Sequence, residues 1–425
     1  MKKIGYFQPK MFLIYLGITV IGLILNISGP GFLGMYALSI IIGSALEWVG
    51  DNIKPIYKYL GGGAFVAIFG SAFIRYLNII PEDIAASVDD FVKNQDFIGL
   101  VVGALICGSI LTMDRKLLIK AGSRYFVPII GGIIVAFGLA GLVGAVAGYG
   151  VREAILFIAL PIMGGGTSAG AVPTSMAYEA TLLHDSGYYL ALMMPAVCIG
   201  NALSVVAAGA LDGMGKSHPK WTGNGKLIDD PNFIVKEDAS SSTPDLLAMG
   251  RGFVATSCLY VVGRILAKFI PGGIHYYAWT IIVCAVLKIA GLVPEELEKD
   301  TKQWYNFCSK TMIPAVYFTV GFTYMNMQQV IESFTLTYFF IILATVVGAV
   351  IGTWFVGKLV KFYPIESAVT AGLCMANMGG SGDLAVLGAA NRMELMPFAQ
   401  ISSRIGGALI IIIANVLAPI IGAGL

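Results

Sequence analysis

Charge is scarce in this sequence. Charged residues make up 12% of its 425 residues, whereas hydrophobic residues make up 57%. A water-soluble domain carries about 25% charged residues, because its surface must be solvated. The shortage of charge therefore excludes an ordinary soluble protein and indicates that most of the surface faces lipid.

Several motifs are missing as well. The six cysteines lie in or beside apolar runs and form no CxxC pair, so we interpret them as packing residues. Neither glycine-rich stretch continues into GK[ST], and there is no metal-site pattern, nucleophile elbow or basic cluster. We therefore expect no cofactor, no nucleic-acid partner and no transport driven by ATP in this chain alone.

What the sequence has instead is long apolar runs. The hydrocarbon core of a bilayer is about 30 Å thick, and a helix needs about 20 apolar residues to cross it. The N-terminal run begins like a signal peptide, but no small-residue cleavage site follows it, so we interpret it as a retained first helix. The sequence predicts an all-α integral membrane protein with eleven spans, at 11–28, 31–46, 59–75, 97–111, 126–149, 188–211, 251–270, 276–293, 312–328, 335–357 and 397–423.

Two further apolar segments, 155–178 and 365–390, make poor single spans. They contain the stretches MGGGTSAGAVPTS (163–175) and MGGSGDLAVLGAAN (378–391). Irregular backbone at membrane depth is tolerated only where it is buried in protein or lines a watered cavity. We predict that both segments are re-entrant hairpins whose glycines let the chain turn.

The positions of Lys and Arg predict the orientation, because cytoplasmic loops carry an excess of both. With the N-terminus inside and both hairpins re-entrant, the outside segments hold only Arg75, Lys93 and Arg152. The inside segments then hold 19 cations: Lys2, Lys3, Lys10, Lys54, Lys58, Arg115, Lys116, Lys120, Arg124, Lys216, Lys220, Lys226, Lys236, Arg251, Lys299, Lys302, Lys310, Lys358 and Lys361. If either segment crossed the bilayer alone, this bias would collapse. We therefore expect the C-terminus outside.

A polar stretch divides the chain into two similar halves. We predict an extra N-terminal helix (1–30), a first repeat (31–211), a cytoplasmic linker (212–250) and a second repeat (251–425). MGGGTS in the first half resembles MGGSGD in the second, and CIGNALSVV resembles RIGGALIII. Five spans per repeat would invert the second repeat relative to the first. Inverted repeats with interrupted helices in matching positions are typical of secondary transporters, with the binding site where the interruptions meet.

Arg404 is a charge inside the last apolar run. An arginine there costs at least about 2.5 kcal/mol unless it faces water or a counter-ion. It could snorkel to the inner interface or pair with an acid. Alternatively, its planar fork could bind a carboxylate bidentately, with Ser402 and Ser403 adding hydroxyl groups. The first repeat has Cys198 at the matching position.

The two glycine turns favour an anion, because free backbone N–H groups and helix N-termini carry partial positive charge. Glycines used only for close helix packing are the alternative. With Arg404, the predicted substrate contacts are Gly165, Gly166, Thr167, Ser168, Gly379, Gly380, Ser381 and Ser403.

Asp383 closes the second glycine stretch. Together with Asn377 and Ser381 it offers oxygen ligands for a hard cation such as Na⁺, and an aspartate can also carry a proton. Asp383 could instead cap the half-helix that follows it. We predict that these three residues bind the coupling ion.

The chain resembles the 2-hydroxycarboxylate transporter family, which includes bacterial citrate/sodium symporters and malate or citrate/lactate exchangers. The resemblance lies in MGGGTSAGAVP, in NMGGSGDLAVLGAANRMELMPFAQISSRIGGA and in the plan of eleven spans and two hairpins. It implies a homodimer in the bacterial inner membrane, an elevator-like transport domain, and a last-helix arginine, Arg404 here, that binds substrate carboxylate.

The resemblance also bears on the substrate. The family signature GGxG matches residues 379–382, whereas the first hairpin has Ser168 in place of the final glycine. Citrate specialists place a second arginine beside the second turn, where this chain has Met378. One clamping arginine favours malate, or lactate, over citrate.

The predicted function is secondary transport of small 2-hydroxycarboxylates, with malate first and citrate or lactate next. Coupling to Na⁺, coupling to H⁺ and malate/lactate exchange all stay open. The alternatives are a channel lined by paired re-entrant loops, a cation/proton antiporter and a membrane-embedded enzyme. Saturable flux with trans-stimulation would exclude a channel, movement of organic anions would exclude the antiporter, and recovery of unchanged substrate would exclude an enzyme.

Overall fold

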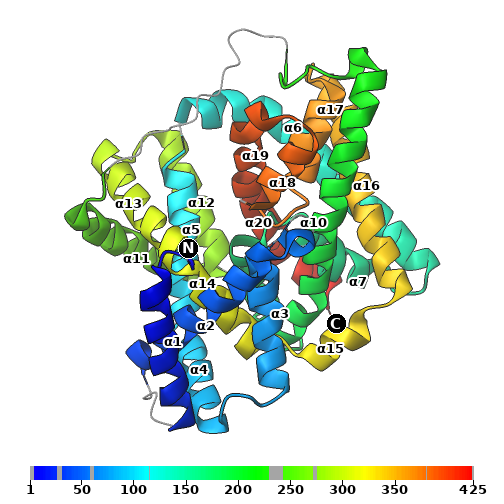
Figure 1. The fold of residues 1–425 in the computed structure, drawn as a ribbon. Coiled ribbons are helices and arrows are strands. Elements are labelled where there is room, and N and C mark those ends of the chain that lie inside the picture. Colours follow the sequence, from blue (N-terminus) through cyan, green and yellow to red (C-terminus); the bar gives the residue numbers. More distant parts are fainter. Residues whose placement is uncertain are drawn as a thin grey trace.

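The computed structural model describes residues 4–25, 31–57, 62–113, 115–228, 243–270, 275–379 and 381–423. Across these residues the secondary structure is helical, apart from one isolated bridge between Ile4 and Phe7, which confirms the all-α class (Figure 1). The longer helices are α1 (Pro9–Ile24), α2 (Phe32–Asn52), α3 (Gly63–Tyr76), α4 (Glu82–Lys93), α5 (Phe97–Leu111), α6 (Arg115–Val146), α10 (Ser186–Ser217), α11 (Leu246–Phe269), α12 (Tyr276–Ala290), α13 (Glu295–Thr311) and α16 (Leu336–Leu359).

Shorter helical pieces join into longer rods. The first of these rods consists of α14 (Ile313–Thr319) and the π-helical turn η5 (Val320–Tyr324), and α15 (Met327–Ser333) follows it. The last helix of the chain is made of α19 (Met396–Ile401), the π-helical turn η8 (Ser402–Gly406) and α20 (Gly407–Ile421).

Each of the eleven predicted spans overlaps a helix. Within the described part of the chain, seven helices are long and apolar enough to cross a bilayer, and α1, α3 and α12 are shorter apolar helices. The predicted span 97–111 coincides with α5, whereas α6 begins at Arg115, well before the predicted residue 126. The number of crossings, the repeats and the orientation remain predictions.

The first glycine segment folds back on itself. One arm contains α7 (Val151–Glu153), η2 (Ala154–Ala159) and α8 (Leu160–Ile162), and the other contains η3 (Thr167–Ala171) and α9 (Val172–Glu179). The Tyr178 hydroxyl donates to the Leu156 carbonyl oxygen at 2.9 Å, so the arms lie side by side. We call residues 151–179 the first hairpin.

The second glycine segment also reverses direction. Its arms are α17 (Pro364–Ser367) with η6 (Ala368–Leu373), and α18 (Ser381–Ala389). Arg392, just beyond α18, bonds through Nε to the Glu366 carboxylate at 2.9 Å, which brings the two ends together. We call residues 364–392 the second hairpin.

The buried apolar side chains form two cores. The hairpin core contains Ile129, Tyr189, Ile342 and Leu387, from α6, α10, α16 and α18. The N-terminal core contains Met35, Phe97, Ile281 and Phe318, from α2, α5, α12 and α14. Figure 1 shows the corresponding division, with α1, α4, α5 and α11–α13 to the left and α10, α16 and α17 to the right. The first hairpin lies where the two cores meet, since its Ala159 belongs to the hairpin core and its Val172 to the N-terminal core.

A network of buried charged side chains stabilises the two ends of the second hairpin. Arg392 and Glu366 are 3% and 0% exposed, and Arg392 also bonds through Nη1 to Asp212 at 2.8 Å. The Thr222 hydroxyl donates to the Glu366 carboxylate at 2.6 Å. This network joins the end of α10, the residues after it and both ends of the hairpin, because each desolvated charge requires a partner.

We predict that Arg392→Met destabilises the protein by about 3–5 kcal/mol, because it leaves the buried Glu366 carboxylate without its cationic partner, whereas Asp212 keeps Lys216. The measurement is the temperature at which half of the detergent-solubilised protein ceases to be monodisperse. Lys299→Met, which breaks the exposed pair of Lys299 with Glu295, is the matched control and should shift this temperature little. Equal shifts for the two variants would contradict the assignment of a stabilising network.

Candidate functional site

The two hairpins meet turn to turn. A Cβ on Gly166 would lie 2.8 Å from the Met378 carbonyl oxygen, and a Cβ on Gly379 would lie 2.7 Å from the Gly165 carbonyl oxygen. Gly165, Gly166 and Gly379 have φ values of 68°, 130° and 68°, which favour glycine. The backbones therefore touch because these positions lack side chains, and the structure brings together the glycines that the sequence predicts to converge.

A cavity of about 330 Å³ lies beside this contact. Arg404 is the one cationic side chain and Asp383 the one carboxylate among the described residues that line it. Gly165, Gly166, Thr167, Gly379 and Ser403 line it from the hairpins and the last helix, whereas Ser109, Tyr305, Ser309 and Tyr317 line it from α5, α13 and α14. The cavity thus lies between the two cores.

Arg404 lies in η8 and faces this cavity. Its guanidinium carbon is 5.6 Å from the centroid of the Tyr305 ring. Within the described residues the guanidinium makes no hydrogen bond and no close ion pair, although it interacts electrostatically with the Asp383 carboxylate, which lines the same cavity. The fork of this side chain is available to an anion.

Thr167 begins the second arm of the first hairpin at the edge of the cavity. It is 3% exposed, and its hydroxyl has no hydrogen-bond partner among the described residues. Because Thr167 lines the cavity, this hydroxyl is free to bond to a molecule bound there. Among the other predicted contacts, Gly380 and the side chains of Ser168 and Ser381 lie outside the described residues.

Asp383 and Asn377 form the polar cluster under the second turn. The Asn377 amide donates to the Asp383 carboxylate at 3.0 Å, and its carbonyl oxygen accepts from the Gly379 N–H at 2.6 Å. The Ser403 hydroxyl lies 2.8 and 2.9 Å from the two Asp383 oxygens. Asp383 is the third residue of α18 rather than the residue before it, so it does not act as the predicted helix cap.

Two residues of α10 support the second turn. The Asn201 side-chain oxygen accepts from the Met378 N–H at 3.2 Å, and the Ser204 hydroxyl donates to the Ala376 carbonyl oxygen at 2.9 Å. The sequence marks CIGNALSVV as a repeat-related stretch but does not predict these bonds, because they join residues more than 170 positions apart. Tyr305 was missed for a similar reason, since nothing in the sequence places α13 beside the last helix.

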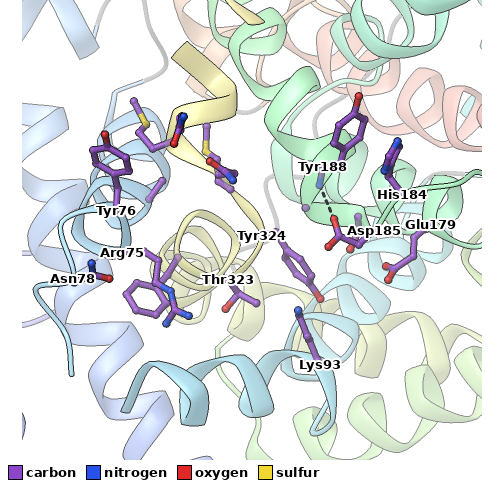
Figure 2. A pocket seen from close by; sticks show the side chains of 18 of the residues that line it. Arg75, Tyr76, Asn78, Lys93, Glu179, His184, Asp185, Tyr188, Thr323 and Tyr324 are labelled. Carbon is purple, nitrogen blue, oxygen red and sulfur yellow. Dashed lines mark hydrogen bonds between the residues drawn. The ribbon is translucent and has the colours of Figure 1, made fainter. Parts of the chain in front are cut away.

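A second cavity, of about 950 Å³, lies between the same two cores (Figure 2). Its lining comes from segments that are predicted to be outside. Figure 2 shows Arg75 on one side of it, Glu179, Asp185 and Tyr188 on the other, and Lys93 below Tyr324. The cations and carboxylates balance, so this lining does not select an anion. Arg75 and Lys93 lie over Phe322 and Tyr324, at 5.1 and 6.0 Å from the ring centroids.

The sequence matches a known family. The model of the 2-hydroxycarboxylate transporter family matches residues 4–416. A citrate/sodium symporter of Salmonella typhimurium is 35% identical over 392 residues, covering 90% of this chain and 87% of that protein. An Na(+)-malate symporter of Bacillus subtilis is 32% identical and covers 98% of this chain and 92% of that protein. The malate transporter MleP of Lactococcus lactis is 30% identical, with 98% and 97% covered.

We predict that Gly166→Ala lowers the rate of malate uptake into membrane vesicles at least about tenfold, because the new methyl group meets backbone and the φ value is strained. Gly138→Ala is the control, since a Cβ on Gly138 meets nothing within 4 Å. Uptake by Gly166→Ala at the rate of the control, with equal protein in the membrane, would show that the close contact of the turns is dispensable.

Proposed function

The chain belongs to the 2-hydroxycarboxylate transporter family, and on that premise we propose that it carries malate across the bacterial inner membrane by alternating access. Family membership confirms that it is a multi-pass membrane transporter and not an enzyme. The relatives are named for the transport of citrate and malate, which favours an organic-anion carrier over the channel and cation/proton antiporter alternatives.

The observation that carries the proposal is the meeting of both glycine turns beside the unpaired guanidinium of Arg404. One carboxylate of malate binds the guanidinium fork bidentately. The other lies at the hairpin turns, where backbone N–H groups and the start of the helix at Thr167 carry partial positive charge. The unpartnered Thr167 hydroxyl donates to the ligand and thereby gains the bond that it lacks.

The lone cation sets the preference for malate. Met378 also lines the cavity, and its side chain is neutral. Citrate has three carboxylates and would bring one more negative charge into a partly desolvated space that offers no second cation among the described residues. Lactate has one carboxylate and would leave the hairpin turns without an anionic partner. Malate matches the two positive regions one to one.

Asp383 supplies the coupling site. It is 1% exposed, and among the described residues its carboxylate is paired with an amide and a hydroxyl rather than with a cation. Arg404 acts on this carboxylate electrostatically but forms no close ion pair with it, and a buried carboxylate in this position takes up a cation or a proton. Oxygen ligands from Asp383 and Asn377 suit Na⁺, and two of the relatives above are named as sodium symporters. Ser403 connects this site to Arg404, its neighbour in the chain, through its bonds to Asp383.

The two cores correspond to the two bodies of an elevator. In the proposed arrangement the hairpin core moves with the substrate, and the N-terminal core stays fixed as the scaffold of a homodimer. The site lies between the bodies, and in the predicted orientation its cavity opens on the cytoplasmic side. The larger cavity of Figure 2 separates the same bodies on the outer side, where movement requires space.

Uptake into proteoliposomes tests this function. The liposomes receive labelled malate, citrate or lactate, with and without an inward Na⁺ gradient, and with and without internal lactate. Saturable malate uptake that rises with the Na⁺ gradient supports sodium symport, and stimulation by internal lactate supports exchange. Absence of malate flux under all these conditions would refute the proposal.

We predict that Arg404→Lys weakens the apparent affinity for malate by about tenfold to a hundredfold, because an ammonium group cannot form the bidentate pair. The measurement is the concentration dependence of malate uptake. Arg264→Lys, which changes an exposed arginine on α11 in the same way, is the control and should leave it unchanged. If Arg404→Lys is expressed normally and binds malate with wild-type affinity, Arg404 does not bind the substrate carboxylate bidentately.

We predict that Asp383→Asn reduces Na⁺-driven malate uptake at least about tenfold but leaves counterflow exchange within about threefold of wild type, because exchange needs no net ion movement. The two fluxes are measured on the same vesicles, with Asp90→Asn on the exposed face of α4 as the control. Loss of counterflow in a folded Asp383→Asn protein would mean that Asp383 serves substrate binding and not only coupling.

A further inference from the structure

Arg404 has a partner that belongs to the other body. The centroid of the Tyr305 ring lies 5.6 Å from the guanidinium carbon, within the range of a cation–π interaction. Among the described residues the guanidinium makes no hydrogen bond and no close ion pair, and the Asp383 carboxylate of its own core acts on its charge through space. The Tyr305 ring therefore lies next to the guanidinium of Arg404. A bound substrate carboxylate would compete with the ring for this guanidinium.

Tyr305 is fixed to the N-terminal core. A Cβ on Gly108 of α5 would lie 2.4 Å from the Tyr305 Cβ, so α13 lies directly on α5 at this point. Arg251 of α11 binds Asp300 of α13 bidentately, at 2.7 and 2.9 Å. Buried Lys288 of α12 pairs with Glu298 of α13. Three neighbouring helices thus hold α13 and its tyrosine in place.

Arg404 is fixed to the hairpin core. The preceding residues Ser402 and Ser403 bond to Tyr125 of α6, at 2.8 Å, and to Asp383 of the second hairpin. A Cβ on Gly407, one turn further, would lie 2.7 Å from the Gly164 carbonyl oxygen of the first hairpin. The contact between Arg404 and Tyr305 therefore joins the two bodies across the binding cavity.

We propose that Tyr305 is a positioning residue that holds the transport body in the state shown while the site is empty, and that a substrate carboxylate releases it. This proposal rests on the proposed function, since Arg404 is its substrate-binding residue. A carboxylate bound to the fork neutralises the positive charge that attracts the face of the ring. The empty carrier is retained on the cytoplasmic side and the loaded carrier is free to move, so the contact favours exchange over net uptake.

The contact between Arg404 and Tyr305 should slow net uptake more than counterflow exchange. Net uptake requires the empty carrier to leave the cytoplasmic state, whereas counterflow exchange requires only the loaded carrier to move. A cation–π contact changes the population of the empty state by about twofold to thirtyfold, depending on desolvation. The ratio of net uptake to exchange therefore reports the contact, and a general loss of stability or expression would lower both fluxes and leave the ratio unchanged.

The experiment measures this ratio in right-side-out vesicles with labelled malate. Tyr305→Leu removes the ring and should raise the ratio about twofold to thirtyfold, Tyr305→Phe keeps the ring and should match wild type, and Tyr305→Trp has a stronger ring and should lower the ratio. Tyr317→Leu is the matched control, because Tyr317 lines the same cavity without lying over Arg404.

Three outcomes would overturn the proposal. The first is a wild-type ratio in Tyr305→Leu, or in Tyr305→Trp if the leucine variant is not produced. The second is a phenylalanine variant that behaves like the leucine variant, which would assign the effect to the hydroxyl group. The third is an equal change in Tyr317→Leu. In each case both malate fluxes persist and the transport function stands, whereas absence of malate flux in the wild type would refute the function itself.

Discussion

The backbone contact between the two glycine turns is the constraint on which the rest of the site depends. Gly166 and Gly379 each approach a carbonyl oxygen of the opposite hairpin at a distance that leaves no room for a Cβ. Because the two turns approach so closely, the N-terminal ends of two half-helices lie together between the two cores. The backbone polar groups of the turns lie there as well. Substrate binding, ion binding and movement are all proposed at this point because the two turns meet there beside the cavity that Arg404 and Asp383 line.

Much of the fold could be predicted from the sequence, because lipid imposes a simple rule on composition. The span predicted at 97–111 coincides with α5, and both glycine segments reverse direction in the structure. Helix ends were harder to predict. The helix α6 begins at Arg115, since a run of cations can continue a helix beyond the apolar region without a change in backbone structure. Hydropathy predicts the part of a helix that lies in lipid, and the helix itself can extend beyond that part.

The site could be predicted only in part, since composition and spacing do not reveal contacts between distant segments. Arg404, Asp383 and the glycines stand out because charge and glycine are unusual in apolar sequence. Tyr305 does not stand out, because it lies in a charged segment between two predicted spans. The sequence predicts this segment as a connecting loop, whereas the structure shows it as the helix α13. Arg392 is buried between Asp212 and Glu366, and the sequence does not reveal this network because the two carboxylates are far apart along the chain.

The asymmetry between the halves follows from the position of the site. In the predicted repeats, Cys198 of the first half, which is buried in the N-terminal core, corresponds to Arg404 of the second half. A second arginine at position 198 would have to be desolvated, whereas Arg404 borders a cavity and an aromatic ring that both stabilise its charge. A single cation at the boundary of the two cores can contact the substrate and the scaffold in turn. Duplicating it would add binding strength for anions but would remove this alternation, because a second cation would hold the substrate independently of Tyr305.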